Sequence, residues 1–210
     1  MRRSIGGGTI QANVEGGTGV DTVTMLLDGL WRSGSKGLFS FDLGGGSDSV
    51  TAALARDVAG DAFGINAGGE LALRARGGTG NDALRVATTG TTAGFVDGVL
   101  RVDLRGGLGN EIIGVDLRVD MFGGRVQLAA DGGPGSDSIG VNFDSSPSVG
   151  SATHDLAVSG GDGNDLVSWT QTNAGTVGFV RPNVLDGGIG TLDSCAAGGV
   201  DAPRTRGCER

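Results

Sequence analysis

The strongest candidates for a chemical role in this chain are acidic residues that follow clusters of glycine. Six of them occupy the sixth position of a stretch such as "GGTGND" or "GGDGND": Asp21, Asp48, Asp82, Glu111, Asp137 and Asp165. Carboxylate and carbonyl oxygens are the ligands that calcium prefers in proteins. A glycine-rich turn can adopt positive φ and present its carbonyl oxygens on one side. The pattern therefore indicates oxygen-rich turns able to hold calcium.

The glycine–acid stretch recurs along the whole chain, at intervals of 26 to 34 residues. Six copies begin at Gly16, Leu43, Gly77, Gly106, Gly132 and Gly160. A degraded seventh copy, "GGIGTLDS", begins at Gly187 and carries its acid, Asp193, one place late. A repeat of this length is typical of a protein made of stacked units, because one unit cannot bury its apolar face alone.

Apolar residues alternate on both sides of each turn. Around the copy at Gly77, for example, Leu71 and Leu73 precede the turn, and Leu84 and Val86 follow it. Alternation with period two predicts strands with one buried face. Each unit is then strand, turn, strand and a longer variable connection.

Stacked units of this kind predict an all-β fold, a parallel β-helix or β-roll-like solenoid of about seven coils. We expect residues 1–194 to form the solenoid and residues 195–210 a C-terminal cap or tail. The sequence is compatible with either two or three strands in each coil. "MRRSIGGGTI" has no apolar run behind its arginines, so it predicts no signal peptide and favours a start inside a longer protein.

Composition narrows the classes of partner. Glycine supplies 44 of the 210 residues, aromatic residues only 4 %, and the formal charge is −8. Nucleic acid is not expected as a partner, because binding it needs a basic surface. No stretch of 18 apolar residues occurs, so no membrane span is expected.

The two cysteines, Cys195 and Cys208, both lie near the C-terminus. They predict one disulfide that closes a terminal cap, worth about 3 kcal/mol in the chain-entropy model; two free thiols are the alternative. A disulfide would place the protein in an oxidising compartment, so we expect it to be secreted or at the cell surface.

The turns resemble the calcium-binding nonapeptide G-G-x-G-x-D-x-U-x of the RTX, or haemolysin-type, repeat proteins. "GGTGNDAL" and "GGDGNDLV" match it fully, while other copies lose the first glycine to Leu43 or carry Glu111 in place of aspartate. The resemblance implies carboxylate ligands from the six acids named above. It implies carbonyl ligands from the turn glycines Gly16, Gly17, Gly19, Gly77, Gly78, Gly80, Gly106, Gly107, Gly109, Gly132, Gly133, Gly135, Gly160, Gly161 and Gly163.

The chain departs from the family in having one nonapeptide per coil of about 28 residues. Calcium is therefore expected along one edge only, between stacked turns, with binding coupled to folding. The alternative is a turn ladder without an ion, in which each aspartate caps its own turn. Six acids in six good copies are more than turn chemistry requires, which favours calcium.

Three classes of function compete. The first is a secreted calcium-binding module with a structural or adhesive role, whose partners would be an extracellular polysaccharide or another copy bound end to end. The second is a β-helix enzyme of the polysaccharide lyase or epimerase type, or a non-catalytic carbohydrate-binding module. The third, an ice binder, needs regular outward threonines, and the threonines of residues 88–92 are isolated.

The enzyme class is the less favoured, and no catalytic residue is predicted. Arg74, Arg76, Arg101 and Arg105, with Asp103, could form a patch for an acidic sugar, although outward charges most often only solvate a strand. His154 is expected to be an exposed strand residue and not a base. Trp31 is expected in a variable loop as a contact point, and Trp169 in the core, where Gln171 suggests that the apolar column ends.

Overall fold

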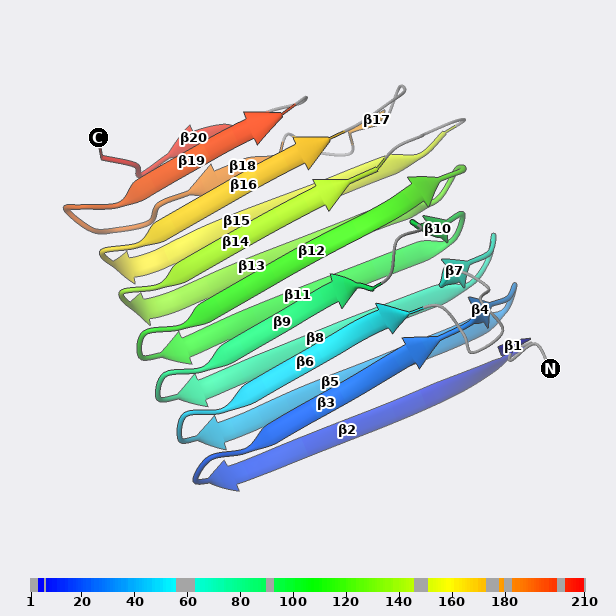
Figure 1. Ribbon diagram of the computed structural model, residues 1–210, viewed down its shortest axis with the longest axis horizontal. Coiled ribbons are helices and arrows are strands. Elements are labelled where there is room, and N and C mark those ends of the chain that lie inside the picture. The colour runs from blue at the N-terminus through cyan, green and yellow to red at the C-terminus, as the bar shows by residue number, and fades with distance from the viewer. Residues whose placement is uncertain are drawn as a thin grey trace.

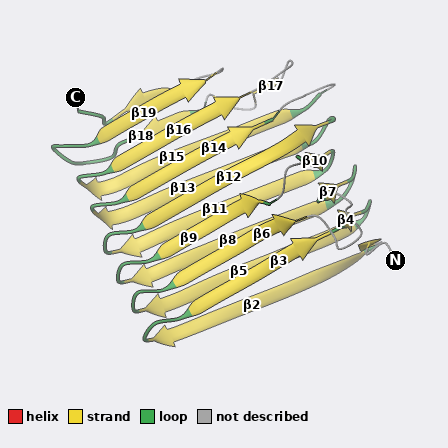
Figure 2. Ribbon diagram, viewed as in Figure 1, coloured by secondary structure: helices red, strands yellow, loops and turns green. Residues whose placement is uncertain are grey.

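The computed structural model describes residues 4–5, 7–55, 63–89, 93–145, 151–172, 178–179, 183–199 and 203–209. Within these ranges the chain forms strands and turns and no helix. The strands wind into a parallel β-solenoid, which confirms the predicted fold class (Figures 1 and 2). The described residues contain no helix that is long and apolar enough to cross a membrane.

Two sheets form the long walls of the solenoid, and neighbouring strands in each are parallel. The first sheet contains β2 (Gly8–Thr18), β5 (Ser35–Gly45), β8 (Glu70–Thr79), β11 (Val99–Leu108), β13 (Arg125–Gly135), β15 (Thr153–Gly163), β18 (Val184–Asp186) and β20 (Arg204–Arg206), with β17 (Gly178–Phe179) beside β15. The second sheet contains β3 (Thr22–Asp28), β6 (Ser49–Ala55), β9 (Ala83–Thr88), β12 (Ile112–Met121), β14 (Ser138–Asp144), β16 (Leu166–Thr172) and β19 (Ser194–Gly199).

A third, short strand is present in several coils, which answers the question that the sequence left open. These strands are β1 (Ser4–Ile5), β4 (Leu30–Trp31), β7 (Gly64–Ile65) and β10 (Gly94–Val96). They pair in the order β1-β4-β7-β10 and then with the end of β12. In β12 the second and third strands have merged into one strand of ten residues.

Equivalent residues of successive coils lie directly beside one another, because the strands pair in register. Leu71 pairs with Leu100, and Leu100 with Val126. All three side chains are fully buried, as are Leu84 and Ile113 in the facing sheet. The alternating residues identified in the sequence therefore form continuous apolar columns in the interior.

Chain reversal occurs at two edges. At the turn edge, on the left in Figure 1, the glycine–acid stretches connect the first sheet to the second. At the opposite edge, called the loop edge here, residues 32–34, 66–69, 97–98 and 122–124 also make tight turns. These turns stack through backbone bonds, such as those from the N–H of Asp97 to the carbonyl of Ile65 and from the N–H of Arg125 to the carbonyl of Gly98. This second ladder was not predicted, since the sequence indicated only a variable connection at this edge.

Two predictions about single residues in this interior were wrong. Trp31 is not a surface contact in a loop: it lies in β4, is buried, and packs edge-on against Phe39 with ring centroids 6.2 Å apart. His154 is not exposed: it is fully buried, 3.2 Å from the amide nitrogen of Asn183 and 3.3 Å from that of Gln171. Trp169 is in the core as predicted, and Gln171 continues its column inward as a buried polar residue.

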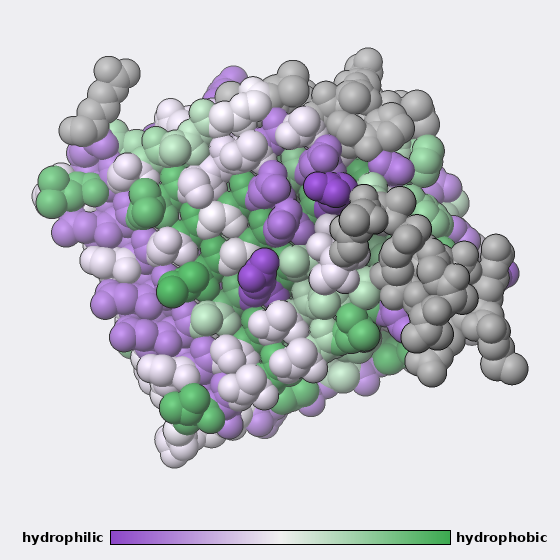
Figure 3. All heavy atoms as spheres, in the orientation of Figure 1, coloured by the Kyte–Doolittle hydropathy of each residue, from purple (hydrophilic) through white to green (hydrophobic). Residues whose placement is uncertain are grey.

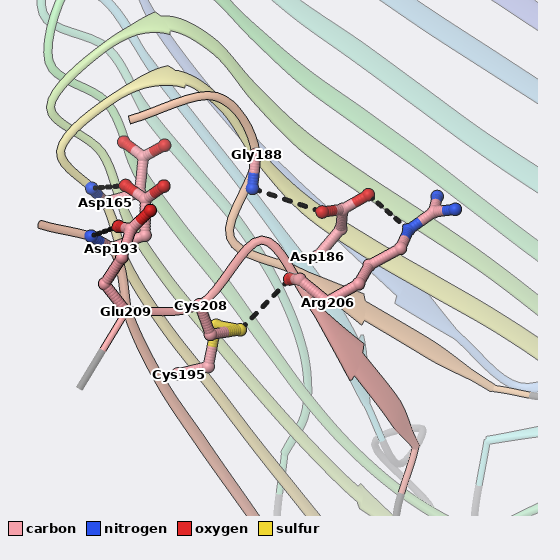
Figure 4. The surroundings of a disulfide bond; sticks show 8 residues. All are labelled: Asp165, Asp186, Gly188, Asp193, Cys195, Arg206, Cys208 and Glu209. Atoms are coloured by element: carbon pink, nitrogen blue, oxygen red, sulfur yellow. Dashed lines mark hydrogen bonds and ion pairs between the residues drawn. A yellow bond between two sulfur atoms is a disulfide. The ribbon is translucent and has the colours of Figure 1, made fainter. Parts of the chain in front are cut away.

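The C-terminal residues continue the solenoid. β19 pairs with β16, and β20 pairs with β18, so the predicted boundary at residue 195 falls inside β19. Cys195 and Cys208 form the predicted disulfide, with their Cα atoms 5.7 Å apart (Figure 4). The bridge ties the end of the chain to the last strand of the second sheet.

Candidate metal centre

The acidic residues predicted from the sequence form one stack at the turn edge, because the strands on both sides of each turn are in register. Their carboxylates point inward under the turns, and Asp48, Asp82, Glu111, Asp137 and Asp165 are each at most 2 % exposed. Asp21, in the first coil, is half-buried. The left side of Figure 3 shows mostly hydrophilic residues at the surface of this edge, with some apolar ones among them. We call this stack of acids the acid column.

One oxygen of most carboxylates in the acid column holds the turn of the preceding coil. The backbone N–H of Asp48 donates to Oδ1 of Asp82, and that of Asp137 donates to Oδ1 of Asp165, both over 2.8 Å. The same bond links Asp21 to Asp48, Glu111 to Asp137 and Asp165 to Asp193. The acids therefore do contribute to turn structure, but mainly to the turn of the neighbouring coil.

The second oxygen of each buried aspartate has no hydrogen-bond partner in the part of the chain that the structure describes. This holds for Oδ2 of Asp48, Asp82, Asp137, Asp165 and Asp193. Glu111 differs, because its carboxyl group forms a side-chain hydrogen bond with Asp137 when it is protonated. Buried polar atoms normally find a partner, because leaving one unpaired costs about 1–3 kcal/mol, and more for a charged group. A recurring set of unpaired carboxylate oxygens is an arrangement that a cation or a bound proton would complete.

The first glycine of each turn leaves room for these oxygens. A Cβ atom on Gly77 would lie 2.3 Å from Oδ2 of Asp82 and 2.5 Å from the carbonyl oxygen of Gly106 in the next coil. On Gly132 it would lie 2.2 Å from Oδ2 of Asp137 and 2.4 Å from the carbonyl oxygen of Gly160. A carboxylate oxygen and a carbonyl oxygen thus converge on the same side of the turn in successive coils, and this donor set fits calcium.

The predicted carbonyl ligands divide into two groups. The carbonyl oxygens of Gly106, Gly132 and Gly160 lie on the carboxylate side of the preceding turn, and Leu43 and Gly187 contribute equivalent oxygens that were not predicted. The carbonyl oxygens of the glycines at the second and fourth positions of each turn instead lie against the equivalent glycine of the next coil. These include the oxygens of Gly78, Gly80, Gly107, Gly109, Gly133 and Gly135.

Burial and like charge make ionisation of the column unfavourable. Burial, followed by a side-chain hydrogen bond with Asp137 and by the charges of the Asp137 and Asp82 carboxylates, raises the pKa of Glu111 to about 8. Burial is also the main cause of the raised pKa of Asp82 and Asp165, with smaller contributions from the Asp48 carboxylate and from Asp137, Asp193 and Asp162. A cation beside the column would offset this repulsion.

Two acids of the column were not among the predicted ligands. Asp193 of the degraded copy is fully buried, and its Oδ1 accepts the N–H of Asp165 over 2.9 Å. The N–H of Asp193 donates in turn to Oε2 of Glu209 over 2.8 Å (Figure 4). Spacing could have indicated Asp193, since an acid one place late can still reach the column, but no repeat pattern marks Glu209.

In the described residues, no group of three or more Asp, Glu, His or Cys side chains is close enough together to hold a metal ion. A metal at the turn edge would therefore need several backbone carbonyl oxygens besides its carboxylates. Comparison with models of protein families, with curated proteins and with solved structures finds no match for this chain. Its function must therefore be inferred from the geometry alone.

Proposed function

We propose that this protein is a secreted calcium-binding repeat module with a structural or adhesive role. Calcium ions would lie between stacked turns of the turn edge, as the resemblance of the turns to RTX repeats implies. The observation that carries the proposal is the set of buried carboxylate oxygens in the acid column that have no partner. The Cys195–Cys208 disulfide supports an extracellular location, because disulfides persist in oxidising compartments.

Ion binding would be coupled to folding. The unpaired oxygen of Asp82 and the carbonyl of Gly106 belong to different coils, so they converge only when the coils have stacked. A ligand that binds only the folded state stabilises it, by about 2.7 kcal/mol at a concentration of 100 Kd. Without calcium, the acid column leaves several charges buried and uncompensated.

The testing experiment is a calcium titration of the chelated, non-reduced protein, followed by far-UV circular dichroism and calorimetry. We expect calcium to produce or strongly stabilise the β spectrum, and magnesium to have little effect, because Mg²⁺ needs a stricter octahedral site and keeps its waters. A protein already fully folded in chelator, with no heat of calcium binding, would contradict the proposal.

A matched variant separates the role of Asp82 in metal binding from its role in turn structure. In Asp82→Asn the amide oxygen can still accept the N–H of Asp48, while the charge and the unpaired carboxylate oxygen are removed. We expect this variant to fold and to bind calcium at least about tenfold more weakly at the affected site. Unchanged calcium affinity would exclude Asp82 as a ligand.

A further inference from the structure

The outer face of the first sheet carries a groove that the calcium proposal does not use. Its centre follows one register row, in which Arg74 pairs with Asp103, Asp103 with Ala129, and Ala129 with Ala157. The two alanines are shorter than the residues of the flanking rows, which leaves a hollow of about 350 Å³. A second hollow of about 360 Å³ adjoins it and shares Arg74, Asp103 and Arg105. We call these two hollows the arginine groove.

Arginines gather at the end of this groove. Arg76 on β8 lies directly beside Arg105 on β11, so two positive side chains project from neighbouring strands about 4.8 Å apart. Like charges in this position repel each other. Asp42 and Asp131 flank the pair in the same row and offset part of this repulsion. Arg74 projects from the same face two residues before Arg76 and lines the same hollow.

Two of these guanidinium groups form no ion pair within the part of the chain that the structure describes. Arg105 pairs with Asp103 over 3.2 Å, and Arg101, further along the groove, pairs with Glu70 over 2.9 Å. Arg74 and Arg76 are exposed and make no ion pair with any residue that the structure describes. The chain has more acidic than basic residues, with a formal charge of −8. A shortage of acids therefore does not explain why these two arginines form no ion pair.

We propose that the arginine groove binds an acidic polysaccharide that lies along the solenoid axis. Arg74, Arg76 and Arg105 would hold carboxylate groups of the sugar chain, since a guanidinium group binds a carboxylate through two parallel hydrogen bonds. The hydroxyl of Ser40 and the amide of Gln127 line the groove and could bind sugar hydroxyls. This assigns a partner to a surface that is separate from the turn edge.

The lining favours a saccharide over a nucleic acid. A protein that binds single-stranded nucleic acid stacks the bases on aromatic side chains. Neither hollow is lined by an aromatic residue, and three carboxylates, Asp42, Asp103 and Asp155, lie among the arginines. These carboxylates can accept hydrogen bonds from the free hydroxyl groups of a sugar chain, which a DNA backbone does not offer.

The test is calorimetric titration with an oligogalacturonate too short to gel, in the presence of calcium and with the fold verified by circular dichroism. We expect binding that weakens as salt is added. The double variant Arg74→Gln/Arg76→Gln should bind at least about tenfold more weakly. The matched control is Arg32→Gln/Arg85→Gln, which removes two exposed, unpaired arginines outside the groove and should bind as the parent does.

Three outcomes would overturn the proposal: no binding by the folded parent protein, an equal loss of affinity in the control variant, or equally tight binding of a neutral glucan or of single-stranded DNA. Each is distinguishable from failure of the calcium proposal, because the titration reports on the first sheet of a protein whose fold has been checked separately.

Discussion

The turn edge and the loop edge reverse the chain by the same means but differ in charge. At both edges a glycine lies so close to a neighbouring coil that no side chain fits: a Cβ atom would be 2.4 Å from a carbonyl oxygen at Gly132 and 2.6 Å at Gly124. Of the loop-edge turns at residues 32–34, 66–69, 97–98 and 122–124, only one contains an acid, Asp97, and that side chain is half-buried. Stacked glycines alone are therefore sufficient to form a corner of this solenoid.

This difference bears on what the acid column does. If tight turns needed a buried carboxylate, the loop edge would also have one in each coil. The acids of the turn edge are thus an addition to the corner, with a cost from burial and repulsion that is absent from the loop-edge turns at residues 32–34, 66–69 and 122–124. The proposed calcium binding would give that cost a function, and the following predictions test the distinction between the two edges.

The largest expected effect comes from filling the space at either edge. Gly133→Ala would introduce a side chain at φ +101, with its Cβ 2.2 Å from the carbonyl oxygen of Gly107. Gly124→Ala would create a similar clash at the loop edge. We expect each to lower the free energy of unfolding by roughly 2–5 kcal/mol, measured by urea denaturation in calcium.

The control for this pair is Gly140→Ala, since a Cβ there would meet nothing nearer than the hydroxyl of Ser168 at 3.5 Å. We expect a change within about 0.5 kcal/mol. If Gly124→Ala were as harmless as this control, the two edges would not share a common corner geometry.

An intermediate effect is expected from removing one charge at each edge. Asp165→Asn should leave stability in chelator unchanged or raised, because it removes a buried carboxylate with a raised pKa while keeping an acceptor for the N–H of Asp137. In calcium, the same variant should lose part of the stabilisation of about 2.7 kcal/mol expected at 100 Kd. The loop-edge counterpart, Asp97→Asn, should respond to calcium as the parent does, as followed by thermal denaturation.

A change of sign between chelator and calcium is the critical result. If an acid only stabilises a turn through its hydrogen bond, substituting it changes the free energy of unfolding equally in chelator and in calcium. Equal changes for Asp165→Asn would therefore favour an ion-free column.

A final prediction concerns pH. Because the pKa of Glu111 is raised from its ordinary value of 4.5 to about 8, the folded protein binds more protons than the unfolded chain between these values. In chelator, stability should therefore fall as pH rises from about 4.5 to about 8. Glu111→Gln should reduce this slope, measured as the urea midpoint at several pH values, whereas Glu15→Gln, an exposed acid on β2, should not. A slope unchanged by Glu111→Gln would show that Glu111 ionises without cost.

The repeat made most of the fold predictable. Alternation around each turn placed Leu84, Val86 and Trp169 in the core, and the spacing of the copies placed the acids in one stack. These features depend on local pattern and on stacking, which repeat from coil to coil.

The errors lie where the repeat is irregular. Trp31 stands in a connection of variable length, so its position in β4 depends on tertiary packing against Phe39. His154 is polar, but it occupies an inward position, and its burial depends on the amide groups of Gln171 and Asn183 from other strands. The loop-edge ladder was missed because its glycines recur without a fixed motif.

The hydrogen bonds that join neighbouring coils in the acid column run in one direction, from the N–H of one coil to the carboxylate of the coil that follows it in sequence. During synthesis, each new turn therefore emerges before the residue that accepts its N–H. A growing chain would carry one incomplete turn at its advancing end, and each later coil would complete the turn before it. Glu209 accepts the bond from Asp193, and the adjacent Cys208 is covalently fixed to β19 through Cys195. The turn at Asp193 is thus completed only by residues made after it, so oxidation of the cysteine pair would hold the completed turn in place.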